Sequence, residues 1–113
     1  MKRSLALLLF VAACAPTTPP PVVAPPPPPP PGLDRLIGKP AASVTAMLGP
    51  ASLDKTEGPA RQMQFVRPVC VLDVYLYPPA AGGAPVVRTA AARKPDGTRM
   101  DPGSCFRLIA PAG

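Results

Sequence analysis

The stretch VCVLDVYLY, residues 69–77, decides the fold of this chain because it is the strongest strand signal in the sequence. It is rich in β-branched and aromatic residues, and side chains in a strand alternate between two faces. The more apolar face carries Cys70, Leu72, Val74 and Leu76, and the other carries Val69, Val71, Asp73, Tyr75 and Tyr77. This alternation is typical of a sheet with one face packed on a core.

Weaker strand signals flank this stretch on both sides. Residues 61–67 alternate, with Met63 and Phe65 on one face, and residues 52–57 and 86–93 are two further candidates. Turn residues separate these segments at Gly58-Pro59, in PPAAGGAP (78–85) and in KPDGT (94–98). Because short connections join antiparallel neighbours, the sequence predicts a sheet of three or four antiparallel strands.

Two helical signals precede the strands. Residues 33–37 have helical spacing, and Gly38 ends that turn. A second helix is expected to begin near Pro40, since proline is favoured at the first helical position, and to end at Gly49-Pro50. The apolar positions of the two segments are Leu33, Leu36 and Ile37, then Val44, Met47 and Leu48.

A closing helix is predicted after Asp101, which has the character of an N-cap and precedes a proline. Cys105, Leu108 and Ile109 would share one face of that helix. The expected fold class is therefore α+β, with two N-terminal helices packed on a three- to four-stranded antiparallel sheet and an added C-terminal helix.

The N-terminus resembles the signal of a bacterial lipoprotein. Lys2 and Arg3 precede an apolar run that is about half the length of a membrane-spanning helix, which fits a signal peptide over residues 1–13. The run ends Val-Ala-Ala-Cys at residues 11–14, the pattern of a lipobox. That resemblance implies cleavage before Cys14 and lipid attachment there. The alternatives are a plain secretory signal with a chance cysteine, or a buried apolar helix.

The position after the lipobox cysteine bears on location. Ala15 is not an aspartate, and in the sorting rule that the lipoprotein resemblance brings in, this implies the outer membrane, with the protein facing the periplasm. Several acyl chains on one cysteine give firm anchoring, whereas one chain alone is marginal. The membrane is therefore the first expected partner, through Cys14.

A proline-rich linker follows the cysteine and completes the segment 14–31. Proline fixes its own φ and disfavours helix in the residue before it, so such a run is extended and semi-rigid. At about 3.1 Å per residue, the run from 16 to 31 spans on the order of 50 Å. We expect a spacer, and the alternative is a ligand for a proline-recognising domain.

Residues 32–113 remain for one small domain. The whole chain has twelve Lys and Arg against six Asp and Glu, a net charge of +6, and two of the basic residues would leave with the signal. The remaining basic residues are scattered and the aromatic residues are few, so no nucleic-acid partner is expected.

Cys70 and Cys105 form the expected disulfide. Strand alternation puts Cys70 on the apolar face, and helical spacing puts Cys105 on the face that would pack against it. The compartment beyond the inner membrane permits disulfides, and the loop closed here would stabilise the fold by roughly 3–4 kcal/mol. The alternatives are two buried free thiols or a metal pair, although zinc usually needs four ligands and the chain has no histidine.

The chemistry of most enzymes is missing from the sequence. Without histidine there is no Ser-His or Cys-His nucleophile pair, and the nearby carboxylates Asp54 and Glu57 lie in a polar segment. We therefore expect a protein that is not an enzyme, with no catalytic residue, no metal, no cofactor and no small-molecule substrate.

The segment LIGKPAASVTAMLGPASLDKTEGPARQMQFV resembles the small outer-membrane lipoproteins of the SmpA/OmlA (BamE-like) family. The matching features are Gly38, Val44, the Leu-Gly-Pro at 48–50, the Glu57-Gly58 turn and the strand that ends in Phe65. The resemblance implies two helices on a three-stranded antiparallel sheet and a role as an accessory subunit in β-barrel assembly. Related folds also occur in β-lactamase inhibitor proteins, so the fold does not fix the partner.

Two functions are therefore expected, both non-catalytic. The first is an outer-membrane lipoprotein that acts as a binding or scaffold module, with β-barrel assembly or other envelope proteins as partners. The second is a periplasmic inhibitor or sensor on a stalk, which binds an envelope hydrolase or peptidoglycan. Tyr75 and Tyr77, or the loop 78–85, are the candidate partner surface, because tyrosine is enriched at binding hot spots.

Overall fold

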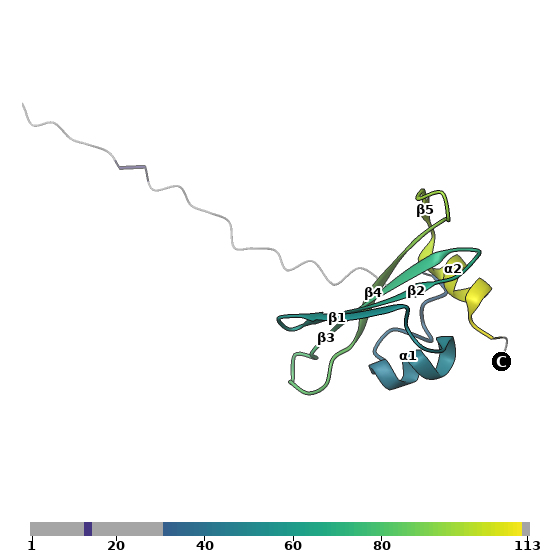
Figure 1. Ribbon diagram of the computed structural model, residues 1–113. Coiled ribbons are helices and arrows are strands. Elements are labelled where there is room, and N and C mark those ends of the chain that lie inside the picture. The colour runs from purple at the N-terminus through teal and green to yellow at the C-terminus, as the bar shows by residue number, and fades with distance from the viewer. Residues whose placement is uncertain (1–12, 15–30, 112–113) are drawn as a thin grey trace, which may run out of the picture.

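The computed structural model describes residues 13–14 and 31–111. Its elements follow the order α1 (Ala41–Leu48), β1 (Leu53–Glu57), β2 (Ala60–Val66), β3 (Val71–Tyr77), β4 (Val86–Arg93), β5 (Arg99–Met100) and α2 (Pro102–Ile109). The strands form one sheet, and both helices lie against it (Figure 1). Helix α1 precedes the five strands in the chain and α2 follows them. The domain is α+β, as the sequence predicts.

All five strands of the sheet are antiparallel and lie in chain order, β1-β2-β3-β4-β5. This is the arrangement that short connections produce, because each strand turns back beside its predecessor. The tightest connection is Gly58-Pro59, between paired residues Glu57 and Ala60. Gly58 has a φ of 55°, which glycine adopts at no steric cost in a two-residue hairpin loop.

Helix α1 forms where alanine, the best helix former, follows Pro40. Val44 and Leu48 are four residues apart, so both point into the core, where they are buried. The helix ends at Gly49, whose N–H donates to the Thr45 carbonyl. Arg67, from the turn between β2 and β3, donates to the Leu48 carbonyl at 2.8 Å and so ties the end of α1 to the sheet.

Helix α2 begins as the sequence predicts, with Asp101 as N-cap and Pro102 at the first helical position. The Asp101 carboxylate accepts hydrogen bonds from the backbone N–H and the hydroxyl of Ser104, each at 2.8 Å. One of the unpaired N–H groups at the helix start is thereby satisfied. Arg107 lies in the last turn, where the helix dipole favours a positive charge.

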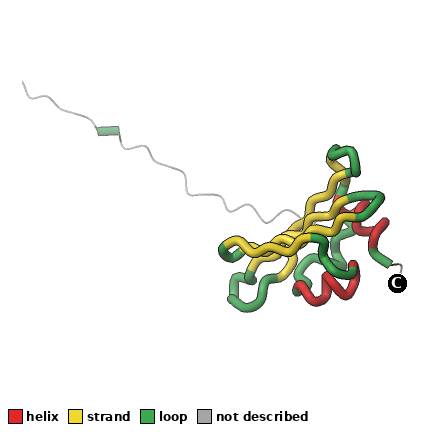
Figure 2. Tube along the Cα trace, viewed as in Figure 1, coloured by secondary structure: helices red, strands yellow, loops and turns green. Residues whose placement is uncertain are grey.

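The core lies between the two helices and one face of the sheet, which we call the helix face. Figure 2 shows both helices against this sheet (helices red, strands yellow). The buried apolar residues are Leu33, Leu36, Val44, Leu48, Met63, Phe65, Cys70, Leu72, Val74, Leu76, Val87, Ala90, Ala92, Cys105 and Phe106. The strand residues in that set alternate along β2 and β3, which is the two-residue period of a strand. In β4, a register shift separates Val87 from Ala90 and Ala92.

The predicted disulfide is confirmed. Cys70 and Cys105 are bonded, with their Cα atoms 6.0 Å apart, and both are fully buried. Cys70 lies in the turn just before β3 rather than within the strand, while Cys105 lies in α2. The bond therefore holds the last helix against the start of the central strand, across 35 residues of sequence.

The prediction of two N-terminal helices is wrong, because the first of them is only a turn. Residues 34–38 form hydrogen-bonded turns, in which the N–H groups of Leu36 and Ile37 both donate to the Leu33 carbonyl. The helix does not continue, because the next N–H, that of Gly38, donates to the Val87 carbonyl of β4 at 2.8 Å. Bonding to the sheet edge thus replaces a second helical turn.

The sheet has five strands, one more than the upper limit of the predicted three or four. The fifth strand, β5, has only two residues, and Arg99 and Met100 pair with Arg93 and Ala92 of β4. Its presence follows from the KPDGT turn, in which the Lys94 N–H donates to the Thr98 carbonyl at 2.8 Å. A two-residue strand has no periodicity to detect, so the sequence pattern alone does not reveal it.

One residue of the predicted face of α2 lies elsewhere. Leu108 is 62% exposed, whereas Phe106 is fully buried and Ile109 packs against the core at its margin. The helix is rotated so that Phe106 points inward with Cys105. The large ring buries more apolar area than Leu108 would, and burial stabilises in proportion to that area.

The chain enters the domain against α2. A Cβ atom added to Gly103 would overlap the carbonyl oxygen of Pro31, so only glycine permits this close approach. Leu33, two residues further on, is fully buried. Apart from residues 13, 14 and 31, the predicted signal peptide (1–13) and proline-rich linker (14–31) lie outside the described residues.

Candidate binding face

The second face of the sheet, which we call the outer face, points away from both helices. Its residues alternate with the core residues and include Lys55, Glu57, Gln62, Gln64, Asp73, Tyr75, Tyr77, Thr89, Ala91 and Arg93. Within residues 31–111, no helix packs on this face. Its side chains are therefore not covered by either helix.

Tyr75 and Tyr77 lie together on the outer face, where the sequence predicts them. Both are half-buried and stand beside a hollow of about 130 Å³. The register explains the hollow, because Ala60 of β2 is paired with Glu57 and lies between much larger neighbours. The small side chain of Ala60, with longer side chains on both sides, leaves room for roughly one side chain of another molecule.

Arg88 reaches Tyr77 because of an irregularity in β4. Tyr75 pairs with Thr89, but Leu76 pairs with Val87, so Arg88 is an extra residue in the register. A bulge of this kind turns a side chain away from its regular position. The Arg88 guanidinium lies over the Tyr77 ring, 4.7 Å from its centroid. The pair forms a cation–π contact on an exposed surface.

The centre of the outer face is a polar network around Asp73. This aspartate is only 5% exposed and is the one buried charged residue within 31–111. Its Oδ1 accepts from Gln64 at 2.8 Å and from Gln62 at 3.2 Å, and Arg93 lies 3.4 Å from its Oδ2. These partners satisfy a charge that would otherwise be costly to bury.

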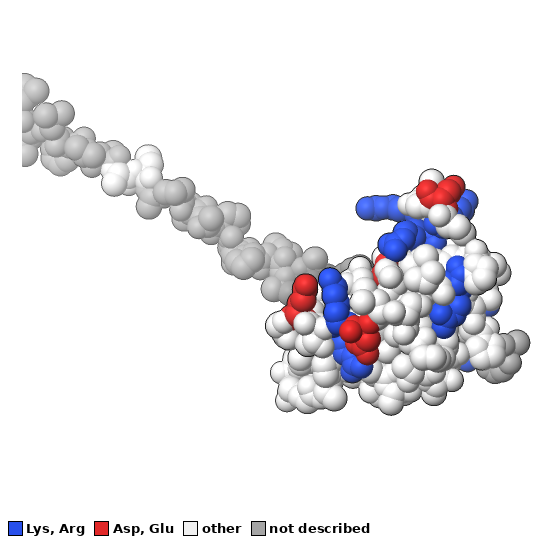
Figure 3. Space-filling model, in the orientation of Figure 1, with Lys and Arg blue, Asp and Glu red and all other residues white. Residues whose placement is uncertain are grey.

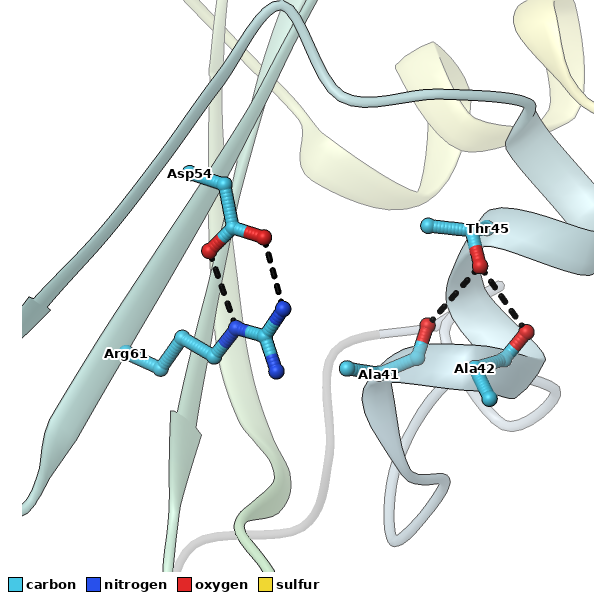
Figure 4. A network of polar contacts seen from close by, with 5 residues as sticks. All are labelled: Ala41, Ala42, Thr45, Asp54 and Arg61. Atoms are coloured by element: carbon cyan, nitrogen blue, oxygen red, sulfur yellow. Dashed lines mark hydrogen bonds and ion pairs between the residues drawn. The ribbon is translucent and has the colours of Figure 1, made fainter.

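Arg61 borders the hollow, but it pairs with the core residue Leu76, so its side chain lies on the helix face, where Asp54 holds it. Its Nε donates to one Asp54 oxygen at 2.9 Å, and Nη2 contacts the other at 2.6 Å (Figure 4). The two-pronged geometry is the strong form of an Arg–carboxylate pair. It lowers the pKa of Asp54 below its ordinary value, chiefly through the hydrogen bond. The other polar group in Figure 4 is internal to α1, where Thr45 donates to the Ala41 and Ala42 carbonyls.

The two carboxylates that lie close together in the sequence, Asp54 and Glu57, both have basic partners. Asp54 pairs with Arg61, and Glu57 lies 3.5 Å from Lys55 on the same strand. Both residues of the second pair are exposed, so it contributes little to stability. Neither carboxylate lies in the sheltered cleft that general acid–base chemistry uses.

Charges of both signs are distributed over the surface. On the face shown in Figure 3, Lys and Arg stand next to Asp and Glu at several points. Two exposed aspartates, Asp96 and Asp101, accept hydrogen bonds from Thr98 and Ser104, and each bond lowers the pKa of its carboxyl. Within residues 31–111 there is no cluster of three or more His, Cys, Asp or Glu that would hold a metal ion.

The predicted site residues separate into three places. Cys14 is exposed and is a free thiol, Cys70 and Cys105 are bonded in the core, and the tyrosines lie on the outer face. The structure brings the tyrosines together with Ala60 and Arg88, which sequence reasoning missed. The Leu76–Val87 register shift places Arg88 there, and no local sequence signal indicates it.

Comparisons with protein-family models, with curated proteins and with solved structures found no match to this chain. Neither of the two described helices has the length and apolar character that crossing a membrane requires. The functional interpretation therefore depends on the residues and their geometry.

Proposed function

We propose that this chain is a lipoprotein of the outer membrane, anchored through Cys14 and facing the periplasm, whose domain is a non-catalytic binding module. The observation that carries the proposal is the contrast among the three cysteines. Cys70 and Cys105 are consumed in one buried bond, whereas Cys14 is exposed and unbonded, at the end of the Val-Ala-Ala-Cys motif. A single free thiol at that position is the group that lipid attachment needs.

The outer face supports the second half of the proposal. It presents two tyrosines beside a hollow, and Tyr and Arg are the residue types enriched at binding hot spots. The buried Asp73 network holds the middle of the face rigid, so the tyrosines are held in place before a partner arrives. We assign partner binding to Tyr75 and Tyr77 on this basis.

The resemblance to the SmpA/OmlA (BamE-like) family leads to a more specific proposal. The order of a helical turn, α1 and an antiparallel sheet fits a variant of that fold in which the first helix is reduced to residues 34–38. The strand β5, the helix α2 and the disulfide are additions to it. On this proposal, the partners are β-barrel assembly proteins or other envelope proteins.

The test of function is a pull-down of the tagged, lipidated protein from detergent-solubilised native envelope. Stoichiometric recovery of barrel-assembly subunits is expected with the wild type. Replacing Tyr75 and Tyr77 together by alanine should abolish recovery while the circular-dichroism spectrum stays native. Replacing both by phenylalanine keeps the rings and serves as the matched control. Recovery that is equal in all three proteins contradicts the assigned surface.

The anchor has its own test. Radiolabelled palmitate should be incorporated into the wild type and not into Cys14→Ser, which should leave the membrane fraction. Because Cys14 takes no part in the core, both proteins should have the same melting temperature. Equal labelling of the two proteins contradicts lipid attachment at Cys14.

The second candidate function is an inhibitor or sensor held on a stalk. It is favoured by the proline-rich sequence of residues 16–31, which is the composition of a spacer. In the same pull-down, recovery of an envelope hydrolase or of peptidoglycan fragments in place of assembly proteins supports this function.

A further inference from the structure

The hollow on the outer face has the shape of a receptor for one side chain. Its floor is formed by Ala60 and Gln62 of β2, and its volume is about 130 Å³. Its walls are Tyr75 and Tyr77 on one side and Lys55 and Glu57 on the other. The tyrosine wall is largely apolar, and an apolar side chain placed against aromatic rings gains burial from both. A pocket that takes one anchor residue is the usual core of a binding hot spot.

Arg88 supplies a positive charge on the ring of Tyr77, which is one wall of the hollow, and does not line the hollow itself. All six acidic residues of the chain lie in the described part, and none of them forms an ion pair with Arg88. The guanidinium instead lies on the Tyr77 ring, where it is exposed. A cation that is held in position and lacks a carboxylate partner is complementary to an acidic group on another molecule.

The other cations near the hollow are already engaged. Lys55, across the hollow from the tyrosines, lies beside Glu57. Arg61 shares the helix face with its register partner Leu76 and is bonded there to Asp54. Arg93, further along the face, lies beside Asp73. The unmatched positive charge nearest the tyrosines is therefore that of Arg88. A ligand that is electrostatically complementary to the site therefore places its negative charge next to Arg88.

We infer that the outer face binds a partner protein through a segment that inserts one apolar side chain between Ala60 and the tyrosines and pairs an adjacent Asp or Glu with Arg88. This inference rests on the proposed binding function and adds the chemistry of the partner. The chain's own segment 15–30 does not fit, since it contains no acidic residue.

Two pairs of variants isolate the two halves of the site. Ala60→Leu fills the hollow, and its control is Ala91→Leu, an exposed alanine elsewhere on the outer face. Arg88→Glu reverses the charge at the site, and its control is Lys94→Glu, an exposed cation at the far end of β4. Each control makes the same chemical change outside the site.

The experiment uses a random dodecapeptide display library panned on the full-length lipidated chain in detergent micelles. Enriched peptides should share an apolar residue within a few positions of Asp or Glu. A fluorescent copy of one such peptide should bind the two control variants like the wild type. It should bind Ala60→Leu and Arg88→Glu more weakly by about tenfold or more, the scale of one hot-spot contact. A Lys-for-acid version of the peptide should regain affinity for Arg88→Glu alone.

Several results would overturn the inference: no shared motif, a motif without an acidic residue, equal losses in the controls, or a concentration-dependent dimer that Ala60→Leu abolishes. If Ala60→Leu unfolds the domain, the charge-swap result with Arg88→Glu decides. The proposed function fails differently. Its failure is equal palmitate labelling of the wild type and Cys14→Ser, or unchanged pull-down by the double tyrosine variant, and neither depends on the acidic group.

Discussion

The two faces of the sheet are built from the same strands, and they differ in what fills the space above them. On the helix face, Phe65 and Leu72 are covered by the two helices and by the disulfide that holds α2 in place. On the outer face, Gln64 and Asp73 occupy the neighbouring positions and bond to each other. The helix face thus carries the packed core, and the outer face is the surface that we propose for recognition.

The contrast also shows in the kind of contact that each face makes. The helix face buries apolar side chains, and the hydrophobic effect that stabilises them is non-directional. The outer face orders polar and aromatic groups through directed bonds, such as those of Gln62 and Gln64 to Asp73. Substitutions on the two faces should therefore separate stability from binding.

The largest effect is expected from the middle of the helix face. Phe65 is fully buried, so Phe65→Ala removes a ring and leaves a cavity, which should cost about 3–5 kcal/mol of unfolding free energy. Chemical denaturation measures the loss. Tyr75→Ala, on the outer face, is the comparison and should cost clearly less. Equal losses would mean that the outer face is also a packed core.

The next largest loss of unfolding free energy is expected when the disulfide is removed. Cys70→Ala should lower the unfolding free energy by about 3–4 kcal/mol under oxidising conditions, because the unfolded chain regains the entropy of the closed loop. Cys105→Ala should behave in the same way. The two melting curves should match that of the wild type with reductant, and a wild-type curve that reductant does not shift contradicts a stabilising bond.

The polar network of the outer face should contribute less. Asp73→Ala leaves the amides of Gln62 and Gln64 without their acceptor, which should cost about 1–3 kcal/mol. Denaturant titration measures this loss. Asp96→Ala, an exposed turn residue, is the control for removing one acidic group. A loss at Asp73 no greater than at Asp96 would mean that the network does not order this face.

The smallest expected effect is on the pH dependence of the melting temperature, through the pair that Asp54 of the edge strand β1 forms with Arg61. Arg61 lowers the pKa of Asp54, so the pair stabilises the fold above the ordinary aspartate pKa, and this contribution is lost as the pH falls through the lowered value. The wild type should therefore melt slightly higher than Asp54→Asn at pH 7, and the difference should shrink as acidification protonates Asp54. A difference that grows on acidification contradicts the assignment.

Much of this fold follows from local sequence. The alternation in residues 71–77, the turn residues at Gly58 and in the KPDGT segment, and the cap at Asp101 each act within a few residues, so the sequence alone reveals them. The pairing of Cys70 with Cys105 is predictable because two independent periodicities point to one layer. The candidate tyrosines follow from the same alternation.

The remaining features depend on contacts between distant segments. The turn at residues 34–38 stops short of a helix because Gly38 bonds to Val87, and α2 rotates to bury Phe106 instead of Leu108 because the core has room for the ring. The hollow requires Ala60 to lie beside Tyr77, and Arg88 reaches the Tyr77 ring through a shift in register. Sequence alone determined which residues alternate, turn and cap, since those preferences are local. Only the tertiary structure decided which of them meet, because that choice depends on packing and hydrogen bonding across the whole sheet.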